Sequence, residues 1–178
     1  MNYCKIKYHA IEDGIGCRTV LFVCGCRHHC KGCFQPETWN FDYGEPFTEK
    51  TEQIIIESLK DNYTAGLTLL GGEPFEPENQ KVLRKFIEKI KTIYPDKSIW
   101  AYSGYTFEEL LNEKSNCHTD DTMPMLNNID VLVDGEFVLD KKNIMLPYRG
   151  SENQRVLDMK SSLKQHKPIL SEYHFKKR

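Results

Sequence analysis

The chain has 178 residues, with 24 lysines and arginines against 26 aspartates and glutamates, so its formal net charge is −2. This length suits one domain, and a hydrophobic content of 39% is enough to bury a core. The near balance of charge argues against nucleic acid as a partner, because such binders usually carry a basic excess. No apolar run approaches the roughly 18 residues of a membrane span, and acidic residues stand where a signal peptide would be apolar. We therefore expect a cytoplasmic protein without a membrane partner.

Short apolar runs predict buried strands, and apolar residues at helical spacing predict helices. In chain order these are a strand at 19–23, a helix within 48–60, a strand at 66–70, a helix at 78–93, a strand at 98–102, a helix from Thr106 and a strand at 129–133. Thr106 and Glu109 form a capping box at the start of the third helix. After Pro147 the pattern weakens, and we expect roughly the last 15 residues to be a frayed or loosely packed tail.

Strands that alternate with helices indicate βαβ units and a mostly parallel sheet with right-handed crossovers. Four or five strands are too few to close an eight-stranded barrel, so we expect an α/β fold with an open partial barrel or a curved sheet, in a single domain over 1–178. The carboxyl ends of parallel strands meet at one edge of a sheet. The loops that follow the four strands should therefore converge on one rim. They are the cysteine cluster, GGEP at 71–74, SGY at 103–105 and DGE at 134–136.

Four of the seven cysteines fall within residues 24–33, directly after the first predicted strand. Because seven is odd and we expect a reducing compartment, clustered thiols indicate metal binding or redox chemistry. Structural zinc commonly takes two separated C-x2-C pairs, and an electron-carrying cluster takes four thiolates. Cys26, Cys30 and Cys33 instead form a C-x3-C-x2-C pattern on one compact loop, which suggests a four-iron cluster with one iron open to a substrate. Candidates for a fourth ligand are Cys24, His28 and His29.

This pattern resembles the signature of the radical S-adenosylmethionine (radical SAM) superfamily. The resemblance implies that Cys26, Cys30 and Cys33 are the catalytic ligands of a 4Fe-4S cluster, and that the open iron is chelated by the methionine end of SAM. The reduced cluster then passes one electron to the sulfonium, and a 5′-deoxyadenosyl radical results. It also implies an open partial (β/α) barrel of the radical SAM type.

The second loop of the rim supports the resemblance. Gly71, Gly72 and Glu73 match the superfamily's GGE motif, which binds the methionine amino group. Glycines let a ligand approach the backbone closely, and a carboxylate accepts a charge-assisted hydrogen bond from an ammonium group. Taken alone, this segment would indicate an ordinary strand-to-helix turn with a solvated glutamate. From its position after the third strand, Ser103 is expected to contact the ribose or the methionine carboxylate of SAM.

One departure from the superfamily pattern concerns the adenine contact. Many members carry an aromatic residue just before the third cysteine, whereas here Gly32 precedes Cys33 and Phe34 follows it. We therefore expect backbone groups around Gly32, Cys33 and Phe34 to contact the adenine.

A longer set of segments resembles the anaerobic ribonucleoside-triphosphate reductase-activating proteins, from the N-terminus to about residue 157. These segments are DGxGxR at 13–18, LFVCGC at 21–26, CFQPETW at 33–39, GGEPF at 71–75, SGYT at 103–106, DVLVDGEF at 130–137 and YRGSENQR at 148–155. Ile15 and Arg27 stand where proline is common, and neither change removes a ligand.

This resemblance implies a glycyl-radical-activating enzyme. Its 5′-deoxyadenosyl radical would take a hydrogen atom from a glycine of the large catalytic subunit of anaerobic ribonucleotide reductase, with methionine and 5′-deoxyadenosine as products. The length leaves no room for the ferredoxin-like insertion of some activating enzymes, so the electron should come from an external donor such as flavodoxin. A partial barrel leaves one side open, through which a loop of a protein substrate could enter.

Two alternatives stay open at this point. The first is a radical SAM enzyme that activates another glycyl-radical enzyme such as formate C-acetyltransferase, against which the DVLVDGEF and YRGSENQR segments argue. The second, from another class, is a non-catalytic zinc or iron–sulfur binding module, which its metal content would reveal. The thiols outside the motif are expected to be buried small side chains or incidental; they are Cys4, Cys17, Cys24 and Cys117.

Overall fold

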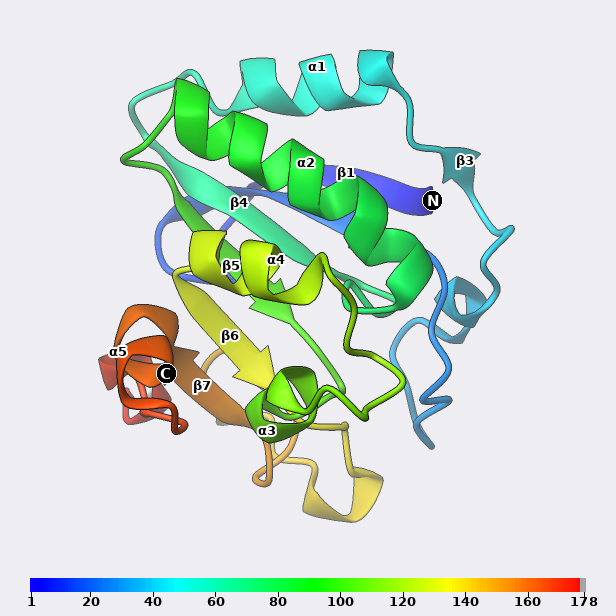
Figure 1. Ribbon diagram of the computed structural model, residues 1–178, viewed down its shortest axis with the longest axis vertical. Coiled ribbons are helices and arrows are strands. Elements are labelled where there is room, and N and C mark those ends of the chain that lie inside the picture. Colours follow the sequence, from blue (N-terminus) through cyan, green and yellow to red (C-terminus); the bar gives the residue numbers. More distant parts are fainter. Residues whose placement is uncertain (177–178) are drawn as a thin grey trace.

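The computed structural model describes residues 1–176 and contains one seven-stranded sheet with helices packed against it (Figure 1). The strands are β1 (Asn2–Ala10), β2 (Cys17–Val23), β3 (Glu45–Pro46), β4 (Thr64–Gly71), β5 (Ser98–Tyr102), β6 (Val131–Asp134) and β7 (Arg155–Asp158). The helices are α1 (Glu49–Ser58), α2 (Pro77–Ile93), α3 (Phe107–Leu111), α4 (Thr122–Asn128) and α5 (Met159–Gln165). None of the helices within residues 1–176 is long and apolar enough to cross a bilayer.

The strand order across the sheet is β3-β1-β2-β4-β5-β6-β7. Its four central strands, β2, β4, β5 and β6, run parallel, whereas β1, β3 and β7 pair antiparallel with their neighbours. Because β3 and β7 form the two edges within the described residues, the sheet is open and does not close into a barrel. The expected α/β class and the four parallel strands are confirmed. The antiparallel strands β1, β3 and β7 were not predicted.

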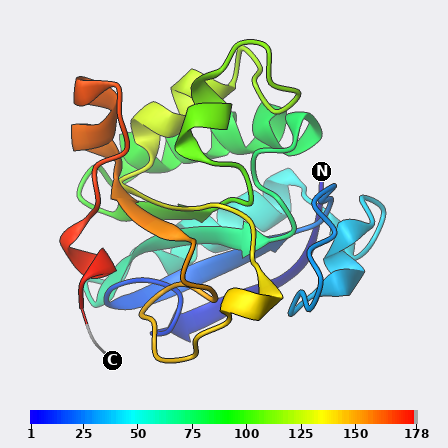
Figure 2. The ribbon, with the colours of Figure 1, turned by 90° about the horizontal axis from the view of Figure 1, so that it is seen from below.

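Helices α1 to α4 cover one face of the sheet, and their apolar sides form the main core with it. In α2 the buried residues recur at helical spacing, as in Leu83, Phe86, Ile87 and Ile90. Figure 2 shows α2 and α4 stacked on the same side of the curved sheet. This packing leaves the carboxyl ends of the parallel strands accessible at one rim.

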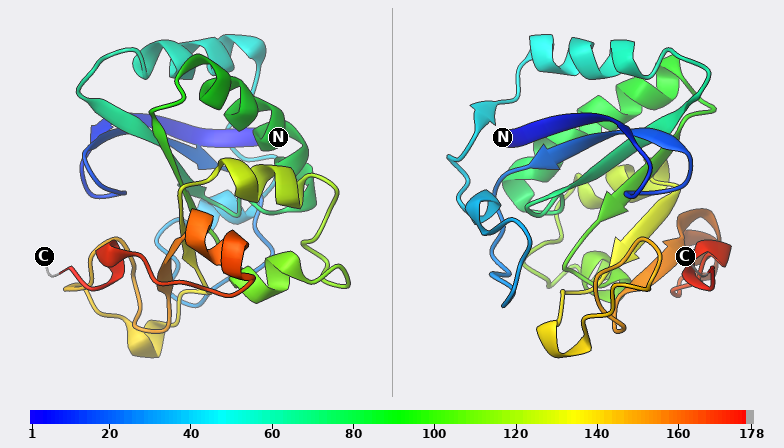
Figure 3. Two further views of the ribbon diagram at one scale, coloured as in Figure 1. Left: turned by 60° about the vertical axis from the view of Figure 1, so that its left-hand side comes forward. Right: turned by 180° about the vertical axis from the view of Figure 1, so that it is seen from behind.

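The opposite face of the sheet is seen in the right-hand view of Figure 3, where loops and the C-terminal segment lie over its lower part. Arg18, near the amino end of β2, is fully buried on this face and donates a hydrogen bond to the main-chain oxygen of Ile15 (3.2 Å). Thr68 of β4 donates from its hydroxyl to the main-chain oxygen of Asp13 (2.9 Å). These bonds fix the 11–16 loop against this face of the sheet.

The final segment of the chain is packed against β7, so the expectation of a loose tail is wrong for the residues that the structure describes. The main-chain nitrogen of Ser171 donates to the oxygen of Val156 (2.8 Å), and Leu170 forms an antiparallel bridge with Leu157. The ring of Tyr173 lies 5.4 Å from that of Trp100, measured between centroids. The segment is ordered because it supplies hydrogen-bond partners to the edge of the sheet. Residues 177 and 178, also part of the expected tail, lie outside the described residues.

Candidate functional site

The carboxyl ends of β2, β4, β5 and β6 surround a cavity of about 550 Å³, a volume typical of small-molecule sites. Eight of the residues predicted to bind a cofactor line it, namely Cys26, Cys30, Cys33, Phe34, Gly71, Gly72, Glu73 and Ser103. Gly32 is not among the lining residues. A Cβ on Gly32 would lie 2.9 Å from the side chain of Leu139, so this glycine faces the segment after β6.

The cysteine loop, residues 24–33, begins where β2 ends. The main-chain nitrogen of Gly25 donates to the oxygen of Thr38 (2.8 Å), and that of Cys26 donates to the oxygen of Trp39 (3.2 Å). Gly25 has a φ of +92°, and a Cβ there would lie 2.3 Å from the ring of Phe41. Only glycine fits this turn, which directs the chain from the strand into the cavity.

Cys26 is buried, whereas Cys30 and Cys33 are half-buried. Burial, followed by the nearby charge of Glu73, raises the pKa of the Cys26 thiol to about 12. Burial also raises the pKa of Cys30. A bound cation would reverse this shift, because it places positive charge beside the sulfur and favours the thiolate.

The metal-binding donors that line the cavity include the three thiols of the cysteine loop. No group of three His, Cys, Asp or Glu side chains within residues 1–176 is placed to hold one metal ion. Three thiols distributed around one cavity instead fit an iron–sulfur cluster, in which each thiolate binds a different iron. The donor set and the cavity are thus compatible with a 4Fe-4S group.

Glu73 is buried, with 1% of its surface exposed, and its carboxylate contacts residues of several loops. Its Oε1 accepts hydrogen bonds from the main-chain nitrogen of Phe75 (2.8 Å) and the hydroxyl of Ser103 (2.9 Å). Its Oε2 accepts from the main-chain nitrogen of Gly104 (2.7 Å) and lies 3.1 Å from Nε2 of His28. Four donors occupy nearly all the lone-pair sites of a carboxylate. The glutamate that the sequence presents as a ligand contact is thus already bonded within the protein.

His28 lies between Cys26 and Cys30 and bridges two carboxylates. Its Nδ1 is 2.7 Å from Oε1 of Glu136, and its Nε2 faces Glu73. Burial lowers the pKa of His28, but the hydrogen bonds to Glu73 and Glu136 and the charges of both carboxylates outweigh burial and raise it to about 9. At neutral pH both ring nitrogens therefore donate.

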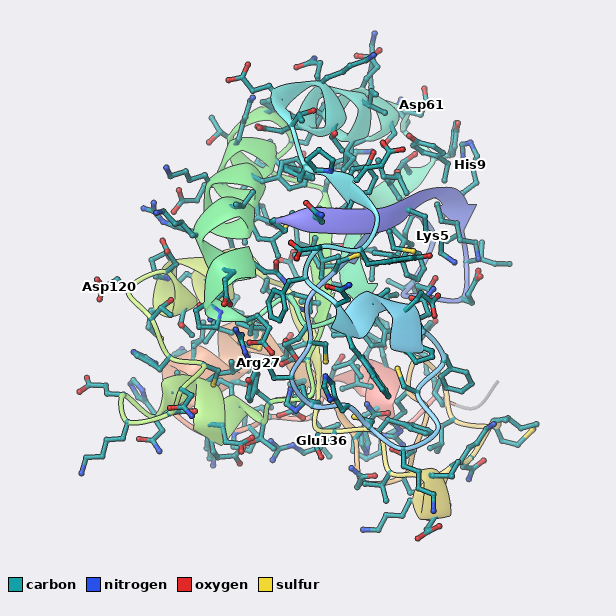
Figure 4. All side chains as sticks on the ribbon, turned by 90° about the vertical axis from the view of Figure 1, so that its right-hand side faces the viewer. Lys5, His9, Arg27, Asp61, Asp120 and Glu136 are labelled. Carbon is teal, nitrogen blue, oxygen red and sulfur yellow. The ribbon has the colours of Figure 1, made fainter. Side chains whose placement is uncertain are left out.

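The DVLVDGEF and YRGSENQR segments lie side by side at the same rim. Arg155 donates to Asp134 through two nitrogens, with Nε–Oδ1 at 2.9 Å and Nη2–Oδ2 at 2.5 Å. The amide of Asn153 donates to the main-chain oxygen of Glu136 (2.8 Å). The loop after β6 is therefore held by the start of β7. Figure 4 looks onto this side of the molecule and labels Arg27 and Glu136.

Comparison with known proteins agrees with this geometry. A family model described as a 4Fe-4S single cluster domain matches residues 12–157. The anaerobic ribonucleoside-triphosphate reductase-activating protein of Pasteurella multocida is 43% identical over 156 residues, which cover 86% of this chain and 95% of that protein. The protein of the same name from Haemophilus influenzae is 40% identical over 156 residues (86% and 96%), and that of Enterobacteria phage T4 is 37% identical over 158 residues (88% and 93%).

The chain belongs to the anaerobic ribonucleoside-triphosphate reductase-activating protein family. This membership confirms the resemblance that the motifs indicated, and the matched domain indicates an iron–sulfur cofactor.

Further residues line the cavity, among them Glu12, Asp13, His28, Tyr102, Tyr148, Arg149 and Gln154. Most of these lie within the DGxGxR, cysteine and YRGSENQR segments. Glu136 meets His28 across 108 positions of sequence. The DGE loop at 134–136 was predicted to lie at this rim, but the contact of Glu136 with His28 depends on the strand order.

Proposed function

We propose that this chain is a radical SAM enzyme that activates the large catalytic subunit of anaerobic ribonucleotide reductase by forming a glycyl radical on it. The observation that carries the proposal is one cavity in which the three thiols of a C-x3-C-x2-C loop meet the GGE loop, in a chain of this family. The relatives' names supply the partner, and the matched 4Fe-4S domain supports the cofactor. The open α/β sheet is then a partial (β/α) barrel of the radical SAM type, in a single domain.

Cys26, Cys30 and Cys33 would hold a 4Fe-4S cluster with one iron open to SAM. When bound, the reduced cluster supplies one electron to SAM, which yields methionine and a 5′-deoxyadenosyl radical. The protein's own part is to orient the two cofactors and to exclude water from the cavity, which keeps the radical close to its target.

SAM carries an ammonium, a sulfonium and a carboxylate, so its site needs groups of both charges. The lining supplies both, with acidic Glu12, Asp13 and Glu73 and basic Lys142 and Arg149 around one cavity. Gly71, Gly72, Glu73 and Ser103 would contact the methionine end and the ribose, with the ammonium of SAM replacing one of the donors that now bond Glu73. The segment Gly32, Cys33 and Phe34 would contact the adenine.

The electron would come from an external donor such as flavodoxin, in the cytoplasm. The reductase subunit would present its glycine at the open side of the partial barrel, where the cavity meets the surface.

Anaerobic reconstitution tests the proposal directly. The chain is loaded with iron and sulfide, reduced, and mixed with SAM and the large reductase subunit. We expect a glycyl-type doublet in the electron paramagnetic resonance (EPR) spectrum, with methionine and 5′-deoxyadenosine released. The Cys26→Ser variant should give neither, and Cys4→Ser should give both.

Three outcomes would contradict the proposal. SAM cleavage without the doublet would point to another substrate, such as formate C-acetyltransferase. A cluster without SAM cleavage, or a colourless protein that holds zinc, would point to a non-catalytic binding module.

A further inference from the structure

The cysteine loop is held from two sides by consecutive residues. On the outer side, the guanidinium of Arg27 donates to both carboxylate oxygens of Glu78, at 3.0 and 2.6 Å, and its main-chain nitrogen donates to Glu76 (2.8 Å). Both glutamates lie at the start of α2, so Arg27 fixes the loop to that helix. The next residue, His28, points to the opposite side.

On the inner side, His28 joins three loops through two contacts. Its Nε2 lies 3.1 Å from Oε2 of Glu73, in the loop after β4, and its Nδ1 lies 2.7 Å from Oε1 of Glu136, in the loop after β6. Glu73 in turn accepts from Ser103 and Gly104, in the loop after β5. One imidazole therefore connects the ends of all four parallel strands.

The surroundings of His28 leave the ring little freedom. Its side chain is 9% exposed, and its ring centroid is 4.3 Å from that of Tyr105. A Cβ on Gly104 would lie 2.5 Å from two atoms of the imidazole, so the ring occupies space that exists only because residue 104 is glycine. The rim is thus shaped to hold this side chain in one position.

We propose that His28 is a positioning residue that fixes the cysteine loop against the loops after β4 and β6, and so sets where Cys26 and Cys30 face the cavity. This inference rests on the proposed role of the three cysteines. Hydrogen bonds to the loop that carries the ligands keep its thiols in place before the metal group binds. In other metal sites, hydrogen bonds around the ligands orient them in the same way. Arg27 does not replace this function, because its contacts leave the loop after β6 untouched.

Two variants disturb the bridge in different ways. His28→Ala removes the imidazole, whereas Gly104→Ala keeps it but pushes it away from Glu73. Hydrogen exchange, followed by mass spectrometry on the cluster-free chain, measures the amides of residues 26–33 and of 134–138. We expect each variant to speed exchange in both segments by roughly ten- to hundredfold, because a charge-assisted bond that closes them is lost.

The double variant separates positioning from general destabilisation. If both substitutions act through the same bridge, Gly104→Ala should add nothing in the His28→Ala background. His166→Asn, at an exposed position at the end of α5, is the matched control and should leave both segments unchanged. Should His28→Ala fail to fold, Glu136→Gln removes the half-exposed partner and should speed exchange in the same two segments.

A second measurement uses the reconstituted protein. Loss of iron to a chelator should be roughly ten- to hundredfold faster in His28→Ala and Gly104→Ala than in the control. Exchange within twofold of the wild type in both segments, or additive effects in the double variant, would overturn the inference. Because exchange is measured without cluster or SAM, a failure to form the glycyl radical would count against the proposed function and leave this result intact.

Discussion

Two arginines lie at opposite ends of the parallel strands and are held in different ways. Arg18, at the amino end of β2, donates to neutral groups only, among them the hydroxyl of Thr68 (2.8 Å) and the main-chain oxygens of Leu67 (2.7 Å) and Ser98 (2.8 Å). Burial lowers its pKa to about 10. At the carboxyl end, Arg155 makes paired hydrogen bonds to two carboxylates, which raise its pKa above the ordinary value.

The difference shows how the fold divides structure from chemistry. At the amino end, one cation with neutral partners holds the 11–16 loop, whose Glu12 and Asp13 reach the lining of the cavity. At the carboxyl end, buried carboxylates gather beside three thiols, and each is bonded to a cation or to main-chain donors. Parallel strands make this division available, because all their carboxyl ends open onto one rim.

The largest effect expected from this division concerns the thiols. Cys17 is the first residue of β2, and Cys26 lies in the loop that follows the same strand. Cys26→Ser, Cys30→Ser or Cys33→Ser should each reduce iron from about four per chain towards zero and reduce SAM cleavage by more than about 100-fold, because a ligand is lost. Cys17→Ser should keep the iron, as measured by iron analysis and visible absorption. An equal loss of iron in Cys17→Ser would contradict the division between the two ends of the strands.

The next effect concerns the arginine at the carboxyl end. Arg155→Met leaves Asp134, which is fully buried, without its counter-ion. Breaking a buried pair in this way typically costs about 3–5 kcal/mol in the free energy of unfolding, measured by urea denaturation. Adding Asp134→Asn should restore part of that loss, because the uncompensated charge disappears. If the double variant were less stable than Arg155→Met, the pair would not act through its charges.

The arginine at the amino end should matter less. Arg18→Met removes hydrogen bonds to neutral acceptors but also removes a buried charge that has no counter-ion among its hydrogen-bond partners. These two changes oppose each other, so we expect a loss of only about 1–2 kcal/mol in the same urea titration. A loss larger than that of Arg155→Met would reverse the comparison between the two ends.

How much of the fold could be predicted depends on how deeply each strand is buried. The parallel strands β2, β4, β5 and β6 are continuous apolar runs buried on both faces, which makes them visible in the sequence. β1 is different, because its residues are mostly half-buried and include lysines, so it has no such run. β7 and α5 are short and depend on packing against their neighbours, which local sequence does not encode.

The candidate site divides in a similar way. Cys26, Cys30 and Cys33 come together through the spacing of one motif, and their approach to Glu73 was predicted because both loops follow parallel strands of one sheet. The contacts of His28 cross 45 positions to Glu73 and 108 to Glu136. Such contacts follow from the strand order, which no single segment contains. Short-range chemistry was therefore predictable, and the bridge that joins its parts was not.

The smallest expected effect lies at the surface of the carboxyl end, where Arg155 also binds the half-exposed Glu108. The hydrogen bond from Arg155 holds the pKa of Glu108 below its ordinary value of 4.5. A lowered pKa in the folded state means that the contact stabilises the protein above pH 4.5 and is lost as the pH falls through the folded-state value. Glu108→Gln should therefore cost about 0.5–1 kcal/mol at neutral pH, and less at high salt, since the pair faces solvent. Urea titrations of both proteins should converge once the pH lies below the lowered folded-state pKa, where the carboxylate is protonated in either state. A difference that persists in acid would mean that packing of the side chain, not its charge, holds α3 to the rim.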